Sequence, residues 1–115
     1  MCTLVLLRRP DDDWPLIIAA NRDEMAGRPW RAPGRWWDDR PEVVAGLDEL
    51  AGGSWLGMNR DGVVAAILNR MGTLGPEPGK RSRGELVLEA LAAGVVEVMA
   101  PDGTCTGVVA WNLDD

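Results

Sequence analysis

The chain has 115 residues and a formal net charge of −6, and it contains no His, Tyr or Phe. A chain of this length can bury one hydrophobic core, so we expect a single domain over residues 1–115. The excess of acidic residues argues against nucleic acid and anionic membranes as partners, because both are bound by basic surfaces. The absence of His excludes imidazole as a general base and as a metal ligand, which leaves Cys, Ser, Thr, Arg, Lys and the carboxylates for catalysis.

The two cysteines, Cys2 and Cys105, are too few for a disulfide framework and favour a reducing compartment. The apolar run that ends at Leu7 is followed by Arg8, and it is too short for the core of a signal peptide or for a membrane span. We therefore expect a cytoplasmic protein with no membrane span.

Two short apolar runs, Cys2–Leu7 and Leu16–Asn21, flank a segment that is rich in turn-forming residues. This pattern predicts an antiparallel β-hairpin. Its tip carries Asp11–Asp13, and a solvated tip is favoured over a metal clamp because consecutive residues of a strand point to opposite faces. The next segment, Asn21–Pro41, combines Pro, Arg and Trp without periodicity, which predicts a long irregular segment.

A brief strand is expected at Val43–Ala45. Two clearer apolar runs, Ser54–Met58 and Val63–Asn69, flank a four-residue turn at Asn59–Gly62 and predict a second hairpin. The Gly- and Pro-rich segment Met71–Lys80 predicts a loop.

The spacing from Ser82 to Glu85 predicts the start of a helix, because each side chain can accept a hydrogen bond from the backbone amide of the other residue. We expect this helix near residues 82–93, with Gly94 ending it. Polar residues are few along it, so most of its circumference is expected to be buried.

Two further apolar runs, Val95–Met99 and Cys105–Trp111, flank an A-P-D-G turn and predict a third hairpin. Antiparallel hairpins together with one clear helix indicate an α+β fold.

Cys2 is the strongest candidate for a catalytic residue. Removal of Met1 would leave a thiol and a free α-amine on one residue, and an amine that titrates at about pH 8 can accept the thiol proton without any His. Antiparallel pairing places the start of the first strand beside the end of the second, so Asn21, Arg22 or Asp23 can approach this amine. A carboxylate there can hold the amine, and Arg22 can bind an anionic group or pair with Asp23. The alternative is that Cys2 is only a small apolar residue of a buried strand. The residues after Asn21 would then form an ordinary turn at the end of the second strand, with a salt bridge.

Several motifs occur in a fixed order along the chain: M-C-T at the start, A-A-N-R-D-E at Ala19–Glu24, G-G-S-W-L-G-M-N at Gly52–Asn59, then I-L-N-R and K-R-S-R-G-E-L-V. Together they resemble the NRDE family, which is also called the transport and Golgi organisation family. The resemblance covers residues 1–93 and leaves a divergent tail at residues 94–115.

That family is in turn similar to the N-terminal nucleophile hydrolases, especially the choloylglycine hydrolase and penicillin V acylase group. The resemblance implies an αββα sandwich, and it implies hydrolysis of an amide bond with Cys2 as the nucleophile. Asp23 would be the partner of the α-amine, and Asn69 would donate a hydrogen bond to the oxyanion. The expected substrate contacts are Asn21, Arg22 and Trp37. No cofactor and no metal are expected.

Proteins of this family are longer than this chain, so the resemblance implies only the N-terminal half of the sandwich. The expected partners are a small-molecule amide or amphipathic ligand, a second copy of the chain, or a second half supplied in trans. A non-catalytic binding or trafficking module that handles haem or an amphipathic ligand is the alternative, as is a truncated inactive product. The Trp- and Arg-rich segment Arg28–Arg40 is consistent with either ligand stacking or local packing of Arg on Trp.

Overall fold

The computed structural model describes residues 2–68, 78–93, 97–98 and 108–112, and the last two segments are described by their backbone. Within these ranges the chain forms eight strands and one helix. In chain order the elements are β1 (Thr3–Arg8), β2 (Leu16–Asn21), β3 (Trp30–Gly34), β4 (Val44–Asp48), β5 (Leu56–Met58), β6 (Val63–Ala66), α1 (Gly84–Ala93), β7 (Glu97–Val98) and β8 (Val108–Asn112).

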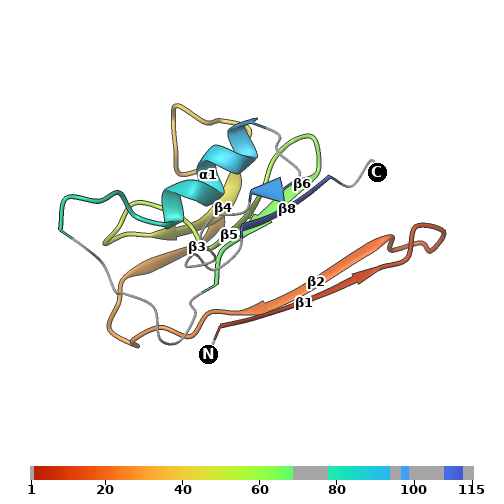
Figure 1. Cartoon of the computed structure of the whole chain (residues 1–115), viewed down its shortest axis with the longest axis horizontal. Coiled ribbons are helices and arrows are strands. Elements are labelled where there is room, and N and C mark those ends of the chain that lie inside the picture. The colour runs from red at the N-terminus through yellow and green to blue at the C-terminus, as the bar shows by residue number, and fades with distance from the viewer. Residues whose placement is uncertain (1, 69–77, 94–96, 99–107, 113–115) are drawn as a thin grey trace.

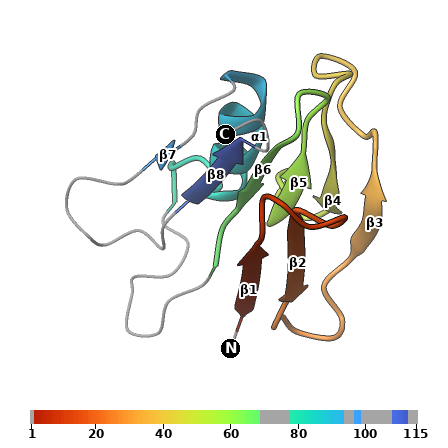
Figure 2. The same ribbon diagram turned by 90° about the vertical axis from the view of Figure 1, so that its right-hand side faces the viewer.

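The strands form two antiparallel sheets. β1 and β2 make a two-stranded sheet, and the other six strands make a sheet in the order β3-β4-β5-β6-β8-β7. The helix α1 lies on one side of the six-stranded sheet and the β1–β2 hairpin lies on the other side (Figures 1 and 2). The predicted α+β class is therefore confirmed.

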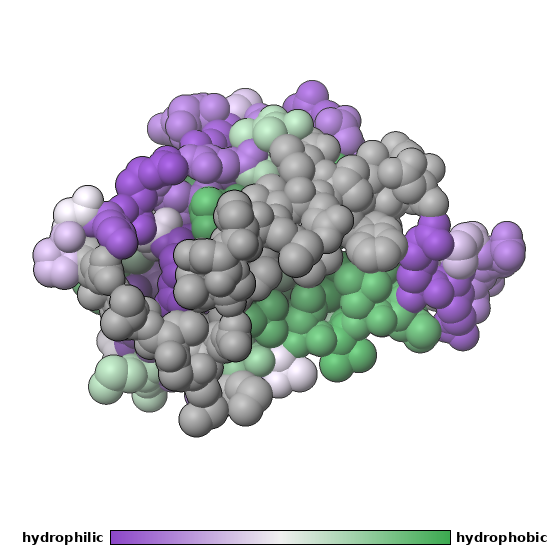
Figure 3. Space-filling view, viewed as in Figure 1, coloured by the Kyte–Doolittle hydropathy of each residue, from purple (hydrophilic) through white to green (hydrophobic). Residues whose placement is uncertain are grey.

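The first hairpin forms as predicted, with Thr3 opposite Asn21 and Arg8 opposite Leu16. Because apolar residues occupy consecutive positions of both strands, both faces of this small sheet are apolar. Val5 is 59% exposed. Figure 3 shows the resulting apolar surface along the hairpin, whose tip points away from the six-stranded sheet in Figure 1.

The hydrophobic core lies between α1 and the six-stranded sheet. Its buried members are Val43, Ala45, Val63, Ala65, Val87, Leu88, Ala90 and Leu91. Small side chains on the sheet let the helix approach closely, and each fully buried Val or Leu stabilises the fold by about 1.5–3 kcal/mol. The β1–β2 hairpin contributes none of these residues, so the core holds only the larger sheet and the helix together.

The helix begins close to the predicted residue. The Ser82 hydroxyl accepts a hydrogen bond from the Gly84 amide at 3.2 Å, and the Ser82 carbonyl accepts one from the Glu85 amide at 3.1 Å. The Glu85 carboxylate lies 3.3 Å from the guanidinium of Arg81. Ser82 thus caps the helix through Gly84, one residue earlier than the predicted capping box requires.

The prediction of an irregular segment over Asn21–Pro41 is wrong at β3. This strand pairs with β4 at the edge of the six-stranded sheet, with a register shift between Arg31 and Gly34. An edge strand tolerates Pro33 because one of its sides needs no ladder hydrogen bonds. Its residues are mostly exposed, so it lacks the apolar alternation by which strands are recognised.

The other predicted hairpins form with different ends. β4 extends past the predicted strand to Asp48, while β5 begins at Leu56 because the Ser54 hydroxyl bonds both backbone groups of Leu56. The buried Asn59 closes the turn to β6 by accepting the amides of Asp61 and Val63 at 2.9 Å each. The third hairpin is present as β7 paired with β8, and the predicted A-P-D-G turn lies outside the described residues.

In the part of the chain that the structure describes, no helix has the length and the apolar character needed to span a bilayer.

Replacing Gly84 with Ala tests the close approach between the helix start and the loop before β5. A Cβ on Gly84 would lie 2.9 Å from the backbone N and O of Ser54, which is closer than real Cβ contacts. We expect Gly84→Ala to lower the free energy of unfolding by about 1–3 kcal/mol, although Ala is the better helix former. Urea unfolding followed by Trp fluorescence measures it. Gly27→Ala, where a Cβ meets nothing within 4 Å, is the control, and a gain in stability for Gly84→Ala would contradict the packing argument.

Candidate functional site

Cys2 lies immediately before β1, beside the residues that follow β2. The Asp23 amide donates a hydrogen bond to the Cys2 Sγ at 3.3 Å, and the Sγ lies 3.7 Å from the Asp23 carbonyl oxygen. The pairing of Thr3 with Asn21 sets this contact, as the antiparallel hairpin predicts. Cys2 is a half-buried free thiol just before the first strand of the small sheet, so it is not a core residue of a buried strand.

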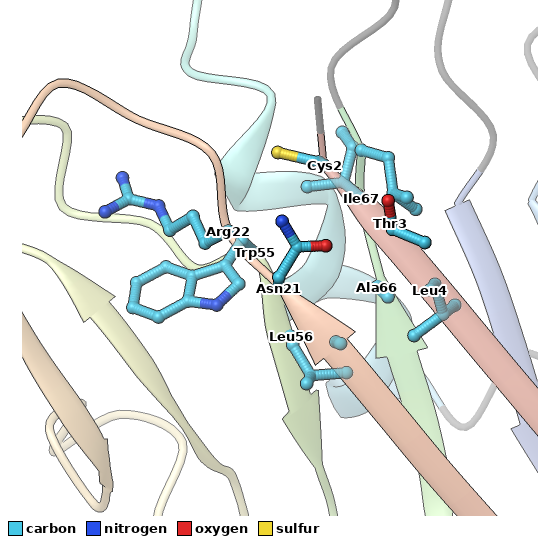
Figure 4. Close-up of a pocket in the computed structure, with 11 residues that line it drawn as sticks. Cys2, Thr3, Leu4, Asn21, Arg22, Trp55, Leu56, Ala66 and Ile67 are labelled. Atoms are coloured by element: carbon cyan, nitrogen blue, oxygen red, sulfur yellow. The ribbon is translucent and has the colours of Figure 1, made fainter.

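A small hollow with about 20 Å³ of free space, open to solvent, adjoins this sulfur; we call it the Cys2 hollow. Its lining residues are Cys2, Thr3, Leu4, Ala20, Asn21, Arg22, Trp55, Leu56, Ala66, Ile67 and Leu68. They come from both sheets, and most of them are apolar (Figure 4). The hollow therefore suits an apolar group placed beside the thiol.

Arg22 borders the Cys2 hollow but is engaged within the protein. Its Nη2 donates to the Asp48 Oδ2 at 2.8 Å, and its guanidinium carbon lies 4.3 Å from the ring centroid of Trp55 (Figure 4). The side chain is 16% exposed. A stacked and paired guanidinium is well fixed, so Arg22 joins the end of β2 to the larger sheet.

Trp55 can lie under Arg22 because β4 has a glycine below the indole. A Cβ on Gly46 would lie 2.5 Å from the Trp55 ring, so any larger residue there would displace the indole. The Trp30 ring meets Trp55 edge-on, with centroids 6.1 Å apart. This edge-to-face contact further fixes the platform on which Arg22 stacks.

The carboxylate of Asp48, the last residue of β4, receives four hydrogen bonds. Its Oδ2 accepts from Arg22 at 2.8 Å and from the Arg28 Nε at 2.9 Å. Its Oδ1 accepts the amides of Leu50 and Ala51 at 3.1 Å each, which closes the turn after the strand. One side chain thus holds a turn with one oxygen and two guanidinium groups with the other.

These contacts decide the charge of Asp48. Burial by itself would raise its pKa, but the hydrogen bonds from Arg28 and the Ala51 amide and the charges of Arg28 and Arg22 outweigh burial, so the pKa is lowered from 3.8. The Glu24 carboxylate lies 4.0 Å from Arg22 and 3.9 Å from Arg28. Two carboxylates thus balance two guanidinium groups beside the Cys2 hollow.

Comparison with known proteins identifies the family of this chain. The family model described as "Transport and Golgi organisation 2" matches residues 1–100. The chain belongs to this family. It is 41% identical over 81 residues to the mouse protein "Transport and Golgi organization 2 homolog", and 43% identical over 83 residues to the bovine "Transport and Golgi organization protein 2 homolog". The human homolog is 40% identical over 85 residues.

The matches cover 68–70% of this chain but 29% of each relative. The chain thus spans under a third of the length of these curated relatives. Their printed names refer to transport and Golgi organisation.

The structure brings only some of the predicted site residues together. Cys2, Asn21 and Arg22 line the hollow, and Asp23 contacts the sulfur through its backbone. Asn69 lies outside the described residues.

Trp37 lies apart from the Cys2 hollow. Its Nε1 donates to the Gly52 carbonyl at 3.1 Å, and its ring packs against the hydrophobic core. Its neighbour Trp36 lies under Arg31, with 5.1 Å from the guanidinium carbon to the ring centroid, and Arg31 pairs with Glu49. The Trp- and Arg-rich segment therefore contains the local packing of Arg on Trp considered from the sequence.

Sequence reasoning missed Asp48 and Arg28. Asp48 is an acidic residue that ends the apolar run V-A-G-L-D and precedes turn-forming residues, which is the available signal. At the hairpin tip, Asp12 pairs with Arg9 at 3.3 Å. Among the described residues no three His, Cys, Asp or Glu side chains are grouped to hold a metal ion.

Asp48→Asn tests the contribution of this carboxylate to stability. Because its pKa in the folded state lies below 3.8, the stabilisation is present above that pH and is lost as the pH falls through the folded-state pKa. We expect Asp48→Asn to lower the free energy of unfolding by about 2 kcal/mol at pH 7, and the difference from the unaltered chain to shrink as the pH falls below 3.8. Urea unfolding over this pH range measures it.

Glu49→Gln is the matched control, since its more exposed pair with Arg31 contributes about 0–1 kcal/mol. A difference for Asp48→Asn that stays constant down to pH 2 would contradict the assignment.

Proposed function

We propose that this chain carries the nucleophile of an amide-bond hydrolase, with the Cys2 thiol attacking the substrate. The observation that carries the proposal is the position of the Cys2 Sγ, which receives the Asp23 amide at 3.3 Å and borders an open, largely apolar hollow. An N–H donor stabilises a thiolate more than a thiol, since the charged acceptor makes the stronger hydrogen bond. The position therefore places the sulfur, with a backbone donor on it, at the edge of the hollow where a substrate can reach it.

The proposed reaction has two steps. After removal of Met1, the α-amine of Cys2 takes the thiol proton, and the sulfur attacks the amide carbon to form a thioester while the amine product leaves with that proton. Water then hydrolyses the thioester, which releases the acid and restores the thiol. In this proposal the Asp23 carboxylate holds the α-amine, and Asn69 donates to the oxyanion, for which one donor contributes about 2.7–4 kcal/mol.

The order of the layers supports the N-terminal nucleophile fold. A helix, the six-stranded sheet and the β1–β2 hairpin follow one another in space, as in the first part of an αββα sandwich (Figures 1 and 2). The hairpin leaves Val5, Leu7 and Ile17 exposed at 59%, 46% and 43%. We propose that a second half in trans or a second copy of the chain packs on this apolar face, which a two-stranded sheet needs for stability.

A non-catalytic module that binds haem or an amphipathic ligand is the second candidate, in keeping with the transport role named for the relatives. The exposed Trp30, at 57%, favours it. The guanidinium groups of Arg22 and Arg31 are already paired with carboxylates, so they add little to the recognition of an anionic ligand. For either function the free Cys2 thiol fits the expected cytoplasmic location.

Cys2→Ala tests the hydrolase. Intact mass measurement of the purified chain is expected to give the chain without Met1. We use penicillin V and glycocholate as probes, since they typify the hydrolases that the family resembles, and detect the released amine. Cys2→Ala is expected to lower the rate by about 10³-fold or more, because it removes the nucleophile.

Cys105→Ala, which alters the other cysteine of the chain, should keep the rate. Retention of Met1 would overturn the mechanism, because the base would then be an amide nitrogen. Hydrolysis that persists in Cys2→Ala would overturn the choice of nucleophile.

A further inference from the structure

The segment that contacts the Cys2 sulfur is held by side chains rather than by a β-ladder. β2 ends at Asn21, and residues 22–25 have no regular secondary structure. Asp23 nevertheless places its amide 3.3 Å from the sulfur. The residue before it, Arg22, is held at two points. Its Nη2 donates to the Asp48 Oδ2 at 2.8 Å, and its guanidinium carbon lies 4.3 Å from the centroid of the Trp55 ring.

We infer that Asp48 is a positioning residue for Cys2: by holding the Arg22 guanidinium, it keeps the Asp23 amide directed at the Cys2 sulfur. This inference rests on the proposed role of Cys2 as nucleophile. Asp48 does not line the Cys2 hollow, so it acts through Arg22. The peptide unit between Arg22 and Asp23 is planar, which passes the anchoring of one residue to the amide of the next.

The two oxygens of Asp48 make the inference testable, because they serve different contacts. Oδ1 accepts the Leu50 and Ala51 amides, and Oδ2 accepts the two guanidinium groups. Asn at this position keeps one oxygen acceptor for the turn. It presents an NH₂ group to guanidinium groups that can only donate, so Asp48→Asn breaks the contact with Arg22 while the turn is retained.

The measurement is the rate at which iodoacetamide alkylates Cys2 at pH 7, read by peptide mass so that Cys105 is counted separately. Iodoacetamide reacts with the charged form of the sulfur, and an N–H donor such as the Asp23 amide makes its stronger hydrogen bond with that form. Asp48→Asn and Arg22→Gln are each expected to slow the alkylation about fivefold, since each releases one hydrogen bond to the sulfur. The double variant is expected to be no slower than either single variant, because both changes remove the same contact.

Arg31 and Glu49 provide matched controls. Arg31 also stacks on an indole, Trp36, and also pairs with a carboxylate, but it does not line the Cys2 hollow. At about 0.15 M ionic strength, Arg31→Gln and Glu49→Gln are expected to change the alkylation rate of Cys2 by less than about twofold, because salt screens exposed charges. They correct for the loss of one charge in each test variant.

Four results would overturn the inference. Asp48→Asn with an unchanged rate would mean that the contact is not needed, and a faster rate would mean that Asp48 acts on the sulfur as a charge. Slowing that adds up in the double variant would mean that Asp48 acts by a route other than Arg22. Should Asp48→Asn lose its cooperative melting transition, Arg22→Gln against Arg31→Gln decides alone, and equal rates in these two variants overturn the inference.

The alkylation readout is independent of hydrolysis. Iodoacetamide reacts with the thiol whether or not Met1 is removed. Coupling between Asp48 and Cys2 without any amide hydrolysis would therefore uphold the inference and count against the proposed hydrolase, while hydrolysis without coupling would do the reverse.

Discussion

The contact of the Asp48 carboxylate with Arg22 is the interaction on which the rest of the site depends. The hydrophobic core unites α1 with the six-stranded sheet and includes no residue of the β1–β2 hairpin. The hairpin, which places Cys2, meets the larger sheet through half-buried apolar residues such as Leu4 and through the polar and stacking contacts of Arg22. Asp48 ends a central strand of the larger sheet, Arg22 follows the last strand of the smaller one, and Trp55 supports the guanidinium from below. The position of the thiol thus follows from how these three residues meet.

Much of the fold could be predicted because its signals are local. The β1–β2 hairpin follows from two apolar runs around a turn, and the helix follows from the Ser82 cap and the apolar residues after it. β3 could not be predicted, because an exposed edge strand that contains Pro33 has neither alternation nor strand propensity. The prediction that β5 begins at Ser54 was wrong for a similar reason. The Ser54 hydroxyl bonds the backbone of Leu56 and replaces the hydrogen bonds of the ladder there.

The candidate site also combines features that the sequence predicts with contacts that it does not predict. Strand pairing alone predicts that the residues after β2 lie beside Cys2, and the pairing of Thr3 with Asn21 confirms this. The contact of the Asp23 backbone amide with the sulfur was not predicted, and the role of the Asp23 carboxylate toward the α-amine stays a prediction. The partner of Arg22 is 26 residues away along the chain and belongs to another sheet, so no local pattern could identify Asp48. Arg28 converges on the same oxygen from a loop with no periodicity. Contacts between sheets depend on the tertiary arrangement, which a single sequence does not specify by spacing.

The hairpin combines two properties that have a common consequence. Both of its faces are apolar, with Val5, Leu7 and Ile17 exposed, whereas its base is held by charged groups. A polypeptide that packs on the exposed apolar face would bury Val5, Leu7 and Ile17, while the clamp of Asp48 on Arg22 fixes the end of the hairpin beside the thiol. The clamp needs no contribution from the apolar faces, so the local geometry at Cys2 can be set within residues 2–68 even though the chain spans 29% of its relatives. A polypeptide that packs on the hairpin would then affect how the hollow is enclosed more than where the Cys2 sulfur lies.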